Sequence, residues 1–549
     1  MERILIIQLS RLGDLVQTVP LLMRLKEDYR NCNISVLCLK EFSCIMEMVS
    51  CVDKLIRIPQ RYVPAEAAEG EEVFASARKK VLEIPELRQR YDLVINLTHS
   101  LFSSQLCSAV ASENKLGRVA SYAGEIRALG DWAKYLFAIS KQRAENLFNI
   151  VDMYVGIGNG RHAPVEPVLT VEESAYNKAV ELLKVNGYEG KSKLVAFQMG
   201  ANQLHRVWPV DKFAALATEL RKEFRVGIVL LGTREENRLA REFCMKTDIP
   251  VINLVGKTTI TDLPAVLKHC DLLISHDTGT IHIAAATGTK TLGLYFSTAY
   301  FAETAPYGEG HVVIQAEMPC SPCRESQICD PLSCRAYITV EVVAAVAKRI
   351  LEGVTHYEEI KAENIMVYVS RFLPNGTLIY IPVCPDIPSR YLTSVVIRLM
   401  WESFFGIGNG KSLLEMLSLE TVYANHIGEE MRQYIDTLDL LGQSYGLGVE
   451  AAKEIIREAE NGAPNHRRIL EKVSDLSRIE STVSTLEGLP GQIRDFHNME
   501  MMDMGYVRFP ELAVEYVKKY QRLGSLAGCC FSAVKNCHDR WTGSGRESQ

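Results

Sequence analysis

The stretch LLISHDTGTIHIAAA, residues 272–286, has the pattern of a strand that ends in a polar turn and leads directly into a helix. The apolar run that begins at residue 272 is typical of a strand buried in a parallel sheet. The small residues that follow Thr280 favour a helix. Because strands that alternate with helices build α/β sheets, this stretch predicts an α/β fold.

The same stretch offers an anion-binding site at the start of its predicted helix. A helix N-terminus presents free N–H groups and a positive dipole end, which suit a phosphate or diphosphate. Gly279 leaves room for a ligand to approach the backbone. Thr278, Thr280 and His282 can donate hydrogen bonds to the same anion. The alternative is a structural turn in which Asp277 or Thr278 only caps the helix.

Strand and helix patterns alternate over two long stretches of the chain, with a Gly- and Pro-rich break between them near residues 155–190. The predicted strands are Arg3–Gln8, Asn33–Leu39, Leu55–Ile58 and Tyr91–Leu97 in the first stretch, and Lys193–Gln198, Val226–Leu231, Val251–Asn253, Asp271–Ser275 and Lys290–Tyr295 in the second. Two α/β units are therefore expected.

Beyond about residue 355 the pattern changes. Two short strand patterns flank a Pro-Asn-Gly turn at 374–376 and predict a hairpin. Long helical patterns follow, at Ser389–Phe405, Lys411–Leu417, Ile427–Leu441, Glu450–Glu460 and Arg467–Leu486. We expect three domains: 1–165, 166–355 and a mostly α-helical extension, 360–549, whose role the sequence does not reveal.

A second candidate site follows the first predicted strand, in the turn SRLGD at 10–14. In open α/β sheets, ligands bind at the carboxyl ends of the strands, where this turn lies. Gly13 permits close backbone approach, and Asp14 can face a cleft. Asp14 can also serve only as a helix cap, and the two roles are compatible.

Two further motifs stand at strand ends in the second α/β stretch. GANQLHRVWP, residues 200–209, contains Arg206, whose forked guanidinium suits phosphate oxygens. A surface position for Arg206 is the alternative. Glu236 lies in LGTREE, residues 231–236, where it can bind a ribose hydroxyl or only favour the helix N-terminus.

Together these motifs resemble glycosyltransferase family 9, the ADP-heptose heptosyltransferases of lipopolysaccharide assembly and their relatives. IIQLSRLGDLVQTVPLLMRLK, GANQLHRVWP and ISHDTGTIHIAAATGT occur in the order and spacing of that family, and the resemblance covers residues 1 to about 353. It implies a GT-B fold of two Rossmann-like domains, the first on the acceptor side and the second binding the nucleotide sugar. It also implies transfer from an ADP-sugar with inversion at the anomeric carbon and without a required metal or other cofactor.

The resemblance assigns roles residue by residue. Asp14 matches the general base. Arg206 falls where many members carry a Lys that contacts phosphate, so the charge is kept and the geometry changes. Glu236 falls near the acidic residue assigned to the donor nucleoside. The donor-binding motif of the second domain corresponds to Asp277, Thr278, Gly279 and His282, and we add Gly13 and Thr280 as expected substrate contacts.

Four cysteines occur close together with the spacing C-x2-C-x5-C-x4-C. Thiolate sets of this kind hold zinc, iron or an iron–sulfur cluster. The resemblance adds that family members carry a Cys-rich segment here and that some relatives bind iron with it. We therefore expect a structural zinc or iron, the alternative being reduced cysteines in a loop. The four residues are Cys320, Cys323, Cys329 and Cys334.

The composition limits the classes of partner. Of 549 residues, 47% are hydrophobic and 23% are charged, and the net charge is -6, as in ordinary soluble proteins. Without a Lys/Arg block, nucleic acid is not an expected partner. No run approaches the roughly 20 apolar residues of a membrane span, and the N-terminus lacks a signal-peptide pattern. We expect a cytoplasmic protein, peripheral to the inner membrane where its glycan or glycolipid acceptor lies.

Three alternatives remain open. The same fold can use another nucleotide sugar or a protein acceptor. A degenerate, non-catalytic scaffold with a partner-binding helical domain is disfavoured because Asp14, Asp277, Gly279 and His282 are all retained. A dehydrogenase is disfavoured because no GxGxxG motif opens a helix after a strand.

Overall fold

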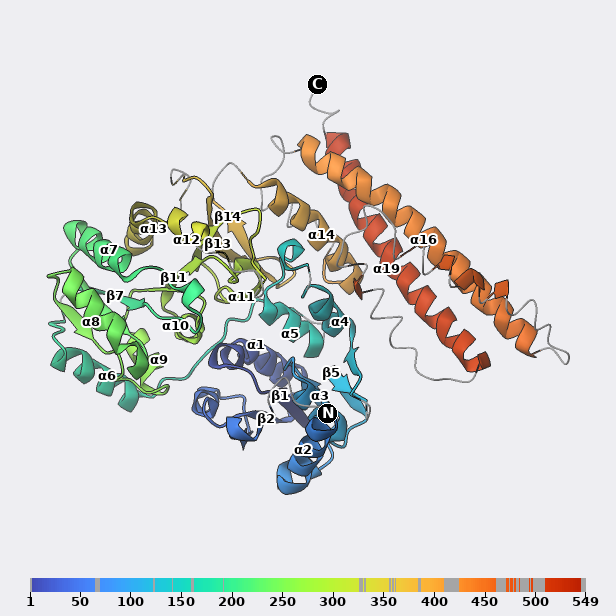
Figure 1. Ribbon diagram of the computed structural model, residues 1–549, viewed down its shortest axis with the longest axis horizontal. Coiled ribbons are helices and arrows are strands. Elements are labelled where there is room, and N and C mark those ends of the chain that lie inside the picture. The colour runs from blue at the N-terminus through green and yellow to red at the C-terminus, as the bar shows by residue number, and fades with distance from the viewer. Residues whose placement is uncertain are drawn as a thin grey trace. The chain divides into compact units, whose positions relative to one another are not determined.

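The computed structural model divides the chain into two compact units. Unit 1 comprises Met1–Leu129 and Phe148–Ile387, and unit 2 comprises Gly130–Leu147 and Pro388–Gln549. Figure 1 shows the elements in chain order. The structure describes the chain except for residues 1, 65–69, 122–123, 141, 159–161, 191, 325–328, 330–331, 355–356, 358–359, 361, 384–386, 409–423, 461–470, 545–549 and most of 473–508.

Sheet A of unit 1 is built from the first strands of the chain. Its order is β3-β2-β1-β4-β5-β6, and its pairs are parallel except for the antiparallel pair β5–β6. The order reverses between β1 and β4, as in a Rossmann half. The bounds are β1 (Arg3–Gln8), β2 (Asn33–Leu39), β3 (Lys54–Ile58), β4 (Leu93–Asn96), β5 (Asn114–Ala120) and β6 (Ile126–Leu129).

Sheet B, also in unit 1, repeats this arrangement and extends it. Its order is β14-β13-β12-β11-β10-β7-β8-β9, with a reversal between β7 and β10. Only the pairs of β13, with β12 and with β14, are antiparallel. The bounds are β7 (Lys193–Gln198), β8 (Val226–Leu231), β9 (Val251–Asn253), β10 (Leu272–Ser275), β11 (Lys290–Tyr295), β12 (Val312–Ala316), β13 (Ile365–Phe372) and β14 (Leu378–Pro382).

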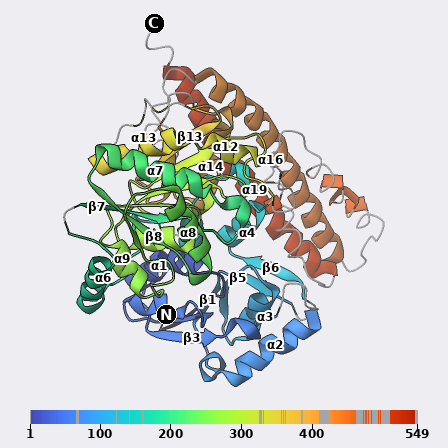
Figure 2. The ribbon, with the colours of Figure 1, turned by 60° about the vertical axis from the view of Figure 1, so that its left-hand side comes forward.

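The helices of unit 1 alternate with these strands, which confirms the predicted α/β class (Figure 2). They are α1 (Leu12–Asp28), α2 (Gly70–Glu83), α3 (Leu101–Ala109), α5 (Ile150–Gly158), α6 (Glu173–Val185), α7 (Val210–Glu223), α8 (Asn237–Lys246), α9 (Asp262–Leu267), α10 (Gly279–Ala286), α11 (Phe301–Thr304), α12 (Ser333–Tyr337) and α13 (Val340–Glu352).

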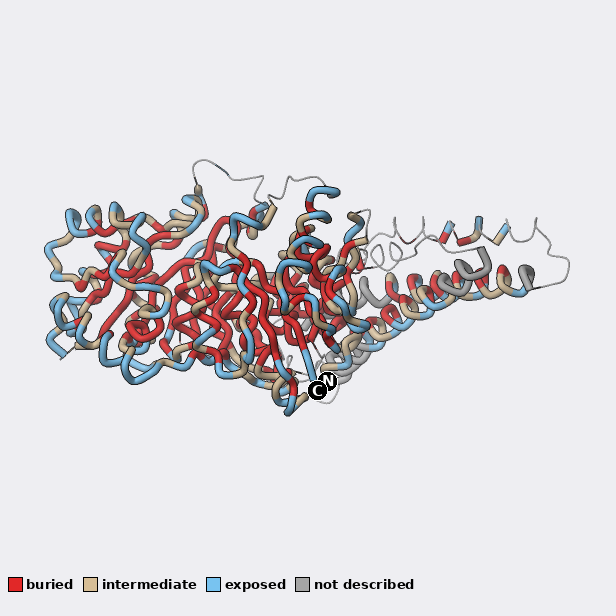
Figure 3. The backbone as a smooth tube through the Cα atoms, turned by 90° about the horizontal axis from the view of Figure 1, so that it is seen from below, coloured by how far each residue is buried: buried red, intermediate tan, exposed pale blue. Residues whose placement is uncertain are grey.

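The cores of unit 1 lie along the sheets, and the buried backbone follows the strands in Figure 3. In β1, Ile4 to Ile7 are all fully buried, as expected of a central parallel strand covered on both faces. On one face of sheet B, apolar side chains of α7 and α13 join those of the strands in a single cluster. A rigid packed sheet therefore carries each of the loops that hold the candidate site.

Unit 2 is helical among its described residues. It consists of α4 (Asp131–Ala138), α14 (Ser389–Phe405), α16 (Ala424–Glu460) and α19 (Phe509–Ser544). In both ribbon views α16 and α19 run side by side (Figures 1 and 2). The predicted helical character of the C-terminal region is confirmed there. The helix expected at 411–417 and most of that expected at 467–486 lie outside the described residues.

The predicted hairpin exists, but its strands β13 and β14 belong to sheet B rather than to the helical extension. The segment 130–147 likewise belongs to unit 2. Neither assignment follows from local pattern, because strand pairing and helix packing join residues far apart in sequence. Within the described part of the chain, no helix is both long and apolar enough to cross a bilayer.

Candidate active site

The reversal points of the two sheets supply the loops of the candidate site. Asp14 lies just after β1 and its loop, Arg206 follows β7, and Asp277 follows β10. The strand order reverses next to each of these strands, so a crevice opens at their carboxyl ends. The motif residues therefore lie at the edge of each sheet where ligands are expected to bind.

These loops line one cavity within unit 1. The loop after β1 and helix α1 contribute a glycine, a carboxylate, a guanidinium and an amide to the cavity wall. The loops after β7 and β10 and the first turn of α10 form much of the wall on the sheet B side. The lining residues are Arg11, Gly13, Asp14, Gln17, Asn202, Arg206, Asp277, Thr278, Gly279, His282 and Thr304.

Asp14 stands in the first turn of α1, and its carboxylate also serves that helix. Its Oδ2 accepts a hydrogen bond from the backbone N–H of Arg11 at 3.0 Å, which satisfies a free donor at the helix start. The hydroxyl of Thr18 donates to the carbonyl of Asp14 at 2.7 Å and holds the turn. Burial, the largest influence, raises the pKa of Asp14 above its ordinary value. A raised pKa makes this carboxylate a stronger base than a free one.

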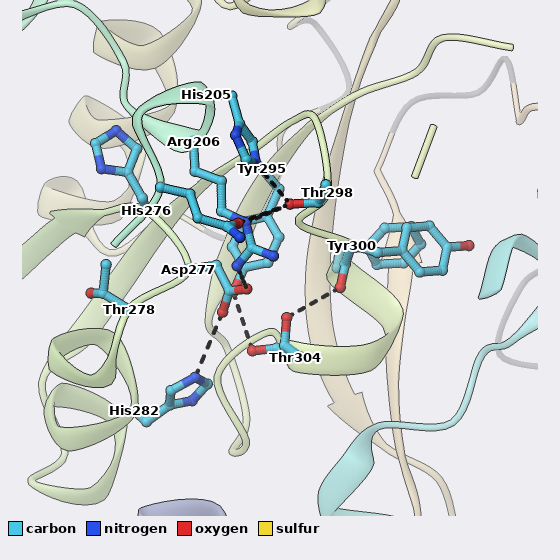
Figure 4. A network of polar contacts seen from close by, with 12 residues as sticks. His205, Arg206, His276, Asp277, Thr278, His282, Tyr295, Thr298, Tyr300 and Thr304 are labelled. Carbon is cyan, nitrogen blue, oxygen red and sulfur yellow. Dashed lines mark hydrogen bonds and ion pairs between the residues drawn. The ribbon is translucent and has the colours of Figure 1, made fainter. Parts of the chain in front are cut away.

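Asp277 lies at the centre of the polar network on the sheet B side (Figure 4). Its carboxylate oxygens lie 3.2 Å from Nη1 of Arg206 and 3.9 Å from Nε2 of His282. Burial pushes the pKa of Asp277 upward, but the neighbouring His282 and the charge of Arg206 outweigh it, so the net pKa is lowered. Asp277 therefore stays ionised and fixes two cationic or hydrogen-bonding groups at the cavity wall.

Arg206 is held from two directions. Its Nε donates to the hydroxyl of Thr298 at 2.6 Å, and its Nη1 donates to Asp277 at 3.2 Å (Figure 4). Its side chain is 20% exposed, so the guanidinium is oriented by protein groups and still reaches the cavity. An oriented, always charged guanidinium at the cavity wall is suited to phosphate oxygens.

His276 positions the loop that carries Arg206. The ring is fully buried, and its Nε2 accepts a hydrogen bond from the backbone N–H of Trp208 at 2.8 Å. Burial lowers the pKa of His276 to about 4, so the ring is neutral near neutral pH, as an acceptor must be. The side chain of Trp208 is itself fully buried, which anchors the loop after β7 in the core.

The loop of sheet A and helix α10 approach each other closely through two glycines. A Cβ atom placed on Gly13 would lie 2.9 Å from Cδ2 of His282, and one placed on Gly279 would lie 3.2 Å from Cδ2 of Leu12. Only glycine fits the first position without moving the histidine. In the structure these glycines allow two protein segments to pack closely, and their predicted role in admitting a ligand stays a prediction.

Two predicted contacts lie outside the residues that line the cavity. Thr280 is buried, and its hydroxyl donates to Oε1 of Gln198 at 3.4 Å. Glu236 accepts hydrogen bonds from the backbone N–H of Thr233 at 2.6 Å and from the side-chain amide of Gln198 at 3.2 Å. A Cβ on Gly200 would collide with this carboxylate, so Glu236 lies against the loop after β7.

Sequence reasoning missed four of the lining residues: Arg11, Gln17, Asn202 and Thr304. The first three lie inside motifs already quoted, and Gln17 stands three residues after Asp14, on the same helix face. Nη1 and Nη2 of Arg11 donate to the amide oxygen of Asn202 at 3.2 and 3.3 Å, with the amide turned to suit its neighbours. Thr304 carries no signal in the sequence.

The described residues of the cysteine segment form no recognisable metal site. Cys323 and Cys334 are buried, whereas Cys320 and Cys329 are exposed. Burial first, and then the neighbouring Cys320 and Cys334 thiols, raise the pKa of Cys323 to about 11. Among the described residues, no group of three or more Cys, His, Asp or Glu side chains is arranged to hold a metal ion. The predicted zinc or iron is therefore not confirmed by the described residues and stays a prediction.

A solved structure shares the fold of unit 1. The glycosyl transferase family 9 protein from Veillonella parvula superposes with a TM-score of 0.52 at 18% identity, over 64% of this chain and 97% of that chain. Two Rossmann-like halves that face each other across a polar cavity form the GT-B fold, so the resemblance in fold is confirmed. The chain therefore belongs, by its fold, among proteins of the GT-B architecture.

Sequence comparison narrows the class to a family. The family model "Glycosyltransferase family 9 (heptosyltransferase)" matches residues 84–331. Lipooligosaccharide heptosyltransferase 2 of Haemophilus influenzae is 27% identical over 317 residues, covering 54% of this chain and 84% of that protein. Lipopolysaccharide heptosyltransferase 3 of Escherichia coli is 24% identical over 302 residues, covering 52% and 80%. Residues 84–331 therefore match the family 9 glycosyltransferases, and the chain is similar to heptosyltransferases of two bacteria.

Proposed function

We propose that this enzyme moves a heptose from ADP-heptose to a glycan acceptor of the lipopolysaccharide-core type, with inversion at the anomeric carbon. The observation that carries the proposal is the shared cavity, in which Asp14 from the sheet A side faces Arg206, Asp277 and His282 from the sheet B side. The heptosyltransferase relatives support the sugar, and their names support a lipopolysaccharide acceptor.

In the proposed reaction, Asp14 accepts the proton of an acceptor hydroxyl while the oxygen of that hydroxyl attacks the anomeric carbon of the donor sugar. The bond between that carbon and the diphosphate oxygen breaks, and ADP leaves with the bonding electrons. A single displacement with one base inverts the configuration. The raised pKa of Asp14 suits the carboxylate to this task.

The departing diphosphate gains negative charge, which the sheet B side of the cavity stabilises. Arg206 supplies a permanent cation held in place by Thr298 and Asp277. His282, together with the free N–H groups at the start of α10, offers further hydrogen-bond donors. Glu236 keeps its proposed role toward the donor nucleoside, through its position beside the loop after β7.

The acceptor and the location complete the proposal. A lipopolysaccharide-core acceptor is carried on a lipid, so we propose that the enzyme works in the cytoplasm at the inner membrane surface.

The predicted zinc or iron at the cysteines stays a prediction that elemental analysis of purified protein would test.

The experiment is a donor screen by calorimetry with ADP-, UDP- and GDP-sugars, followed by a transfer assay read by product mass. The proposal expects ADP-heptose to bind best and to add one heptose to a heptose-deficient core oligosaccharide. Preference for a UDP- or GDP-sugar would favour the alternative donor, and transfer to protein only would favour the alternative acceptor. Absence of both binding and transfer would point to a scaffold.

A further inference from the structure

The nitrogen of one amide in the cavity wall has no partner among the described residues and no part in the proposed reaction. Gln17 is 4% exposed and lines the cavity from helix α1. Its Nε2 atom is buried and has no hydrogen-bond partner among the described residues. Buried polar groups are almost always hydrogen-bonded, and an unpaired one is destabilising. An unpaired donor at a cavity wall therefore indicates a group that pairs when the cavity is filled.

The position of Gln17 on the helix indicates which substrate it meets. Gln17 follows Asp14 by three residues, and side chains with this spacing are neighbours on one helix face. The diphosphate-binding groups, by contrast, come from the sheet B loops and α10. The amide is thus a neighbour of the proposed base on the same helix face.

The rest of the α1 turn is already paired, which singles out this side chain. Asp14 accepts from the Arg11 backbone, Thr18 donates to the Asp14 carbonyl, and Gln8 donates to the hydroxyl of Thr18 at 3.4 Å. These bonds fix the turn without Gln17. The helix consequently holds the amide in place and leaves its nitrogen available.

We propose that Gln17 is an acceptor-binding residue, whose amide donates a hydrogen bond to an oxygen of the acceptor sugar next to the hydroxyl that Asp14 deprotonates. This inference rests on the proposed function and adds a contact that selects and orients the acceptor. The contact requires a hydroxyl or ring oxygen at that place on the sugar, so acceptors without it are bound more weakly.

The test compares two buried glutamines in the full-length protein. Gln17→Met removes the unpaired amide, whereas Gln105→Met removes a buried amide whose Nε2 donates to the carbonyl of Ser121 at 2.9 Å. We expect Gln17→Met to melt at or above the wild-type Tm and Gln105→Met to melt below it. With a deacylated, heptose-deficient core oligosaccharide as acceptor, Gln17→Met should raise the acceptor KM about tenfold, the loss of one hydrogen bond.

The donor provides the internal control. Calorimetric binding of ADP should be unchanged in Gln17→Met, and the kinetic constants of Gln105→Met should equal those of the wild type. A Tm loss in Gln17→Met as large as in Gln105→Met would show a structural amide and overturn the inference. A change in ADP affinity with an unchanged acceptor KM would overturn it as well. A wild-type chain that transfers nothing contradicts the proposed function instead, and the Tm comparison still decides the role of Gln17.

Discussion

At the scale of single residues, Asp14 shows how a helix start and a reaction site share one side chain. The carboxylate accepts from the Arg11 backbone and caps α1, yet burial raises its pKa. A carboxyl group whose pKa is higher in the folded than in the unfolded chain opposes folding once it is ionised. The protein therefore carries an unfavourable charge at the place where the proposed base must stand.

Because the ionised Asp14 carboxylate opposes folding, Asp14→Asn should stabilise the protein by an amount that depends on pH. Above the raised pKa of the folded state, the wild-type carboxylate is ionised and destabilising, so the variant should have the higher Tm at about pH 7. As the pH falls through the raised folded pKa toward the ordinary aspartate range, both states bind the proton and the difference should shrink. Thermal melts of both proteins across this range give the answer, and a Tm difference that grows in acid would contradict it.

Seven of the predicted site residues come together at one cavity in the structure. Gly13, Asp14, Arg206, Asp277, Thr278, Gly279 and His282 all line the cavity, because their motifs stand at strand ends that a parallel sheet brings to one edge. Gln17 and Thr304 were missed because a polar side chain on a buried helix face, or a threonine after β11, looks the same in a sequence whether or not it meets a cavity. Thr280 does not line the cavity, and its hydroxyl donates to Gln198, so its predicted substrate contact stays a prediction.

At the scale of elements, the parallel strands were the most predictable. Arg3–Gln8, Lys193–Gln198 and Val226–Leu231 have the predicted bounds, since short apolar runs between polar turns have few alternatives. The two helical patterns at 427–441 and 450–460 are instead one helix, α16, which continues through Gly442, Gly446 and Gly448. Packing against α19 outweighs the low helix propensity of these glycines.

The glycines of α16 predict opposite effects for two neighbouring substitutions. Gly446 is exposed, and a Cβ there meets nothing within 4 Å, so Gly446→Ala should stabilise the helix by about 0.5–1 kcal/mol. Gly448 is buried, and a Cβ there would lie 2.9 Å from the ring of Tyr520, so Gly448→Ala should destabilise by about 1–3 kcal/mol.

Hydrogen exchange of the α16 amides measures both effects in the full-length protein. Exchange should slow in Gly446→Ala and accelerate in Gly448→Ala, and each variant serves as the control for the other. Equal shifts in the two variants would mean that the packing of α16 on α19 differs from the structure.

At the scale of the whole molecule, unit 2 draws on two separate parts of the chain. Its short segment, Gly130–Leu147, packs against α14: the rings of Trp132 and Phe405 stack with centroids 3.8 Å apart, and those of Tyr135 and Trp401 lie 4.8 Å apart. The sequence places 130–147 within the first α/β stretch, and no local signal distinguishes it. This long-range pairing explains why domain organisation was less predictable than the sheets.

Because unit 2 is built from two separate segments of the chain, a chain ending at residue 387 should fold poorly. Without α14, the buried faces of Trp132 and Tyr135 would be exposed to water, and apolar patches of this kind promote aggregation. Such a truncation should give less soluble protein and bind a hydrophobic dye more strongly than the full chain. A truncation at 387 that is soluble, monomeric and silent toward the dye would refute the role given to this segment.

We infer that a proton-accepting carboxylate of one Rossmann-like half works across a single cavity with the anion-binding groups of the other half. The most direct measurement is heptose transfer by Asp14→Asn beside its affinity for ADP. The variant should lose about a hundredfold or more in turnover while its affinity for ADP stays nearly unchanged. Turnover equal to that of the wild type, in a variant that still binds ADP, would contradict it.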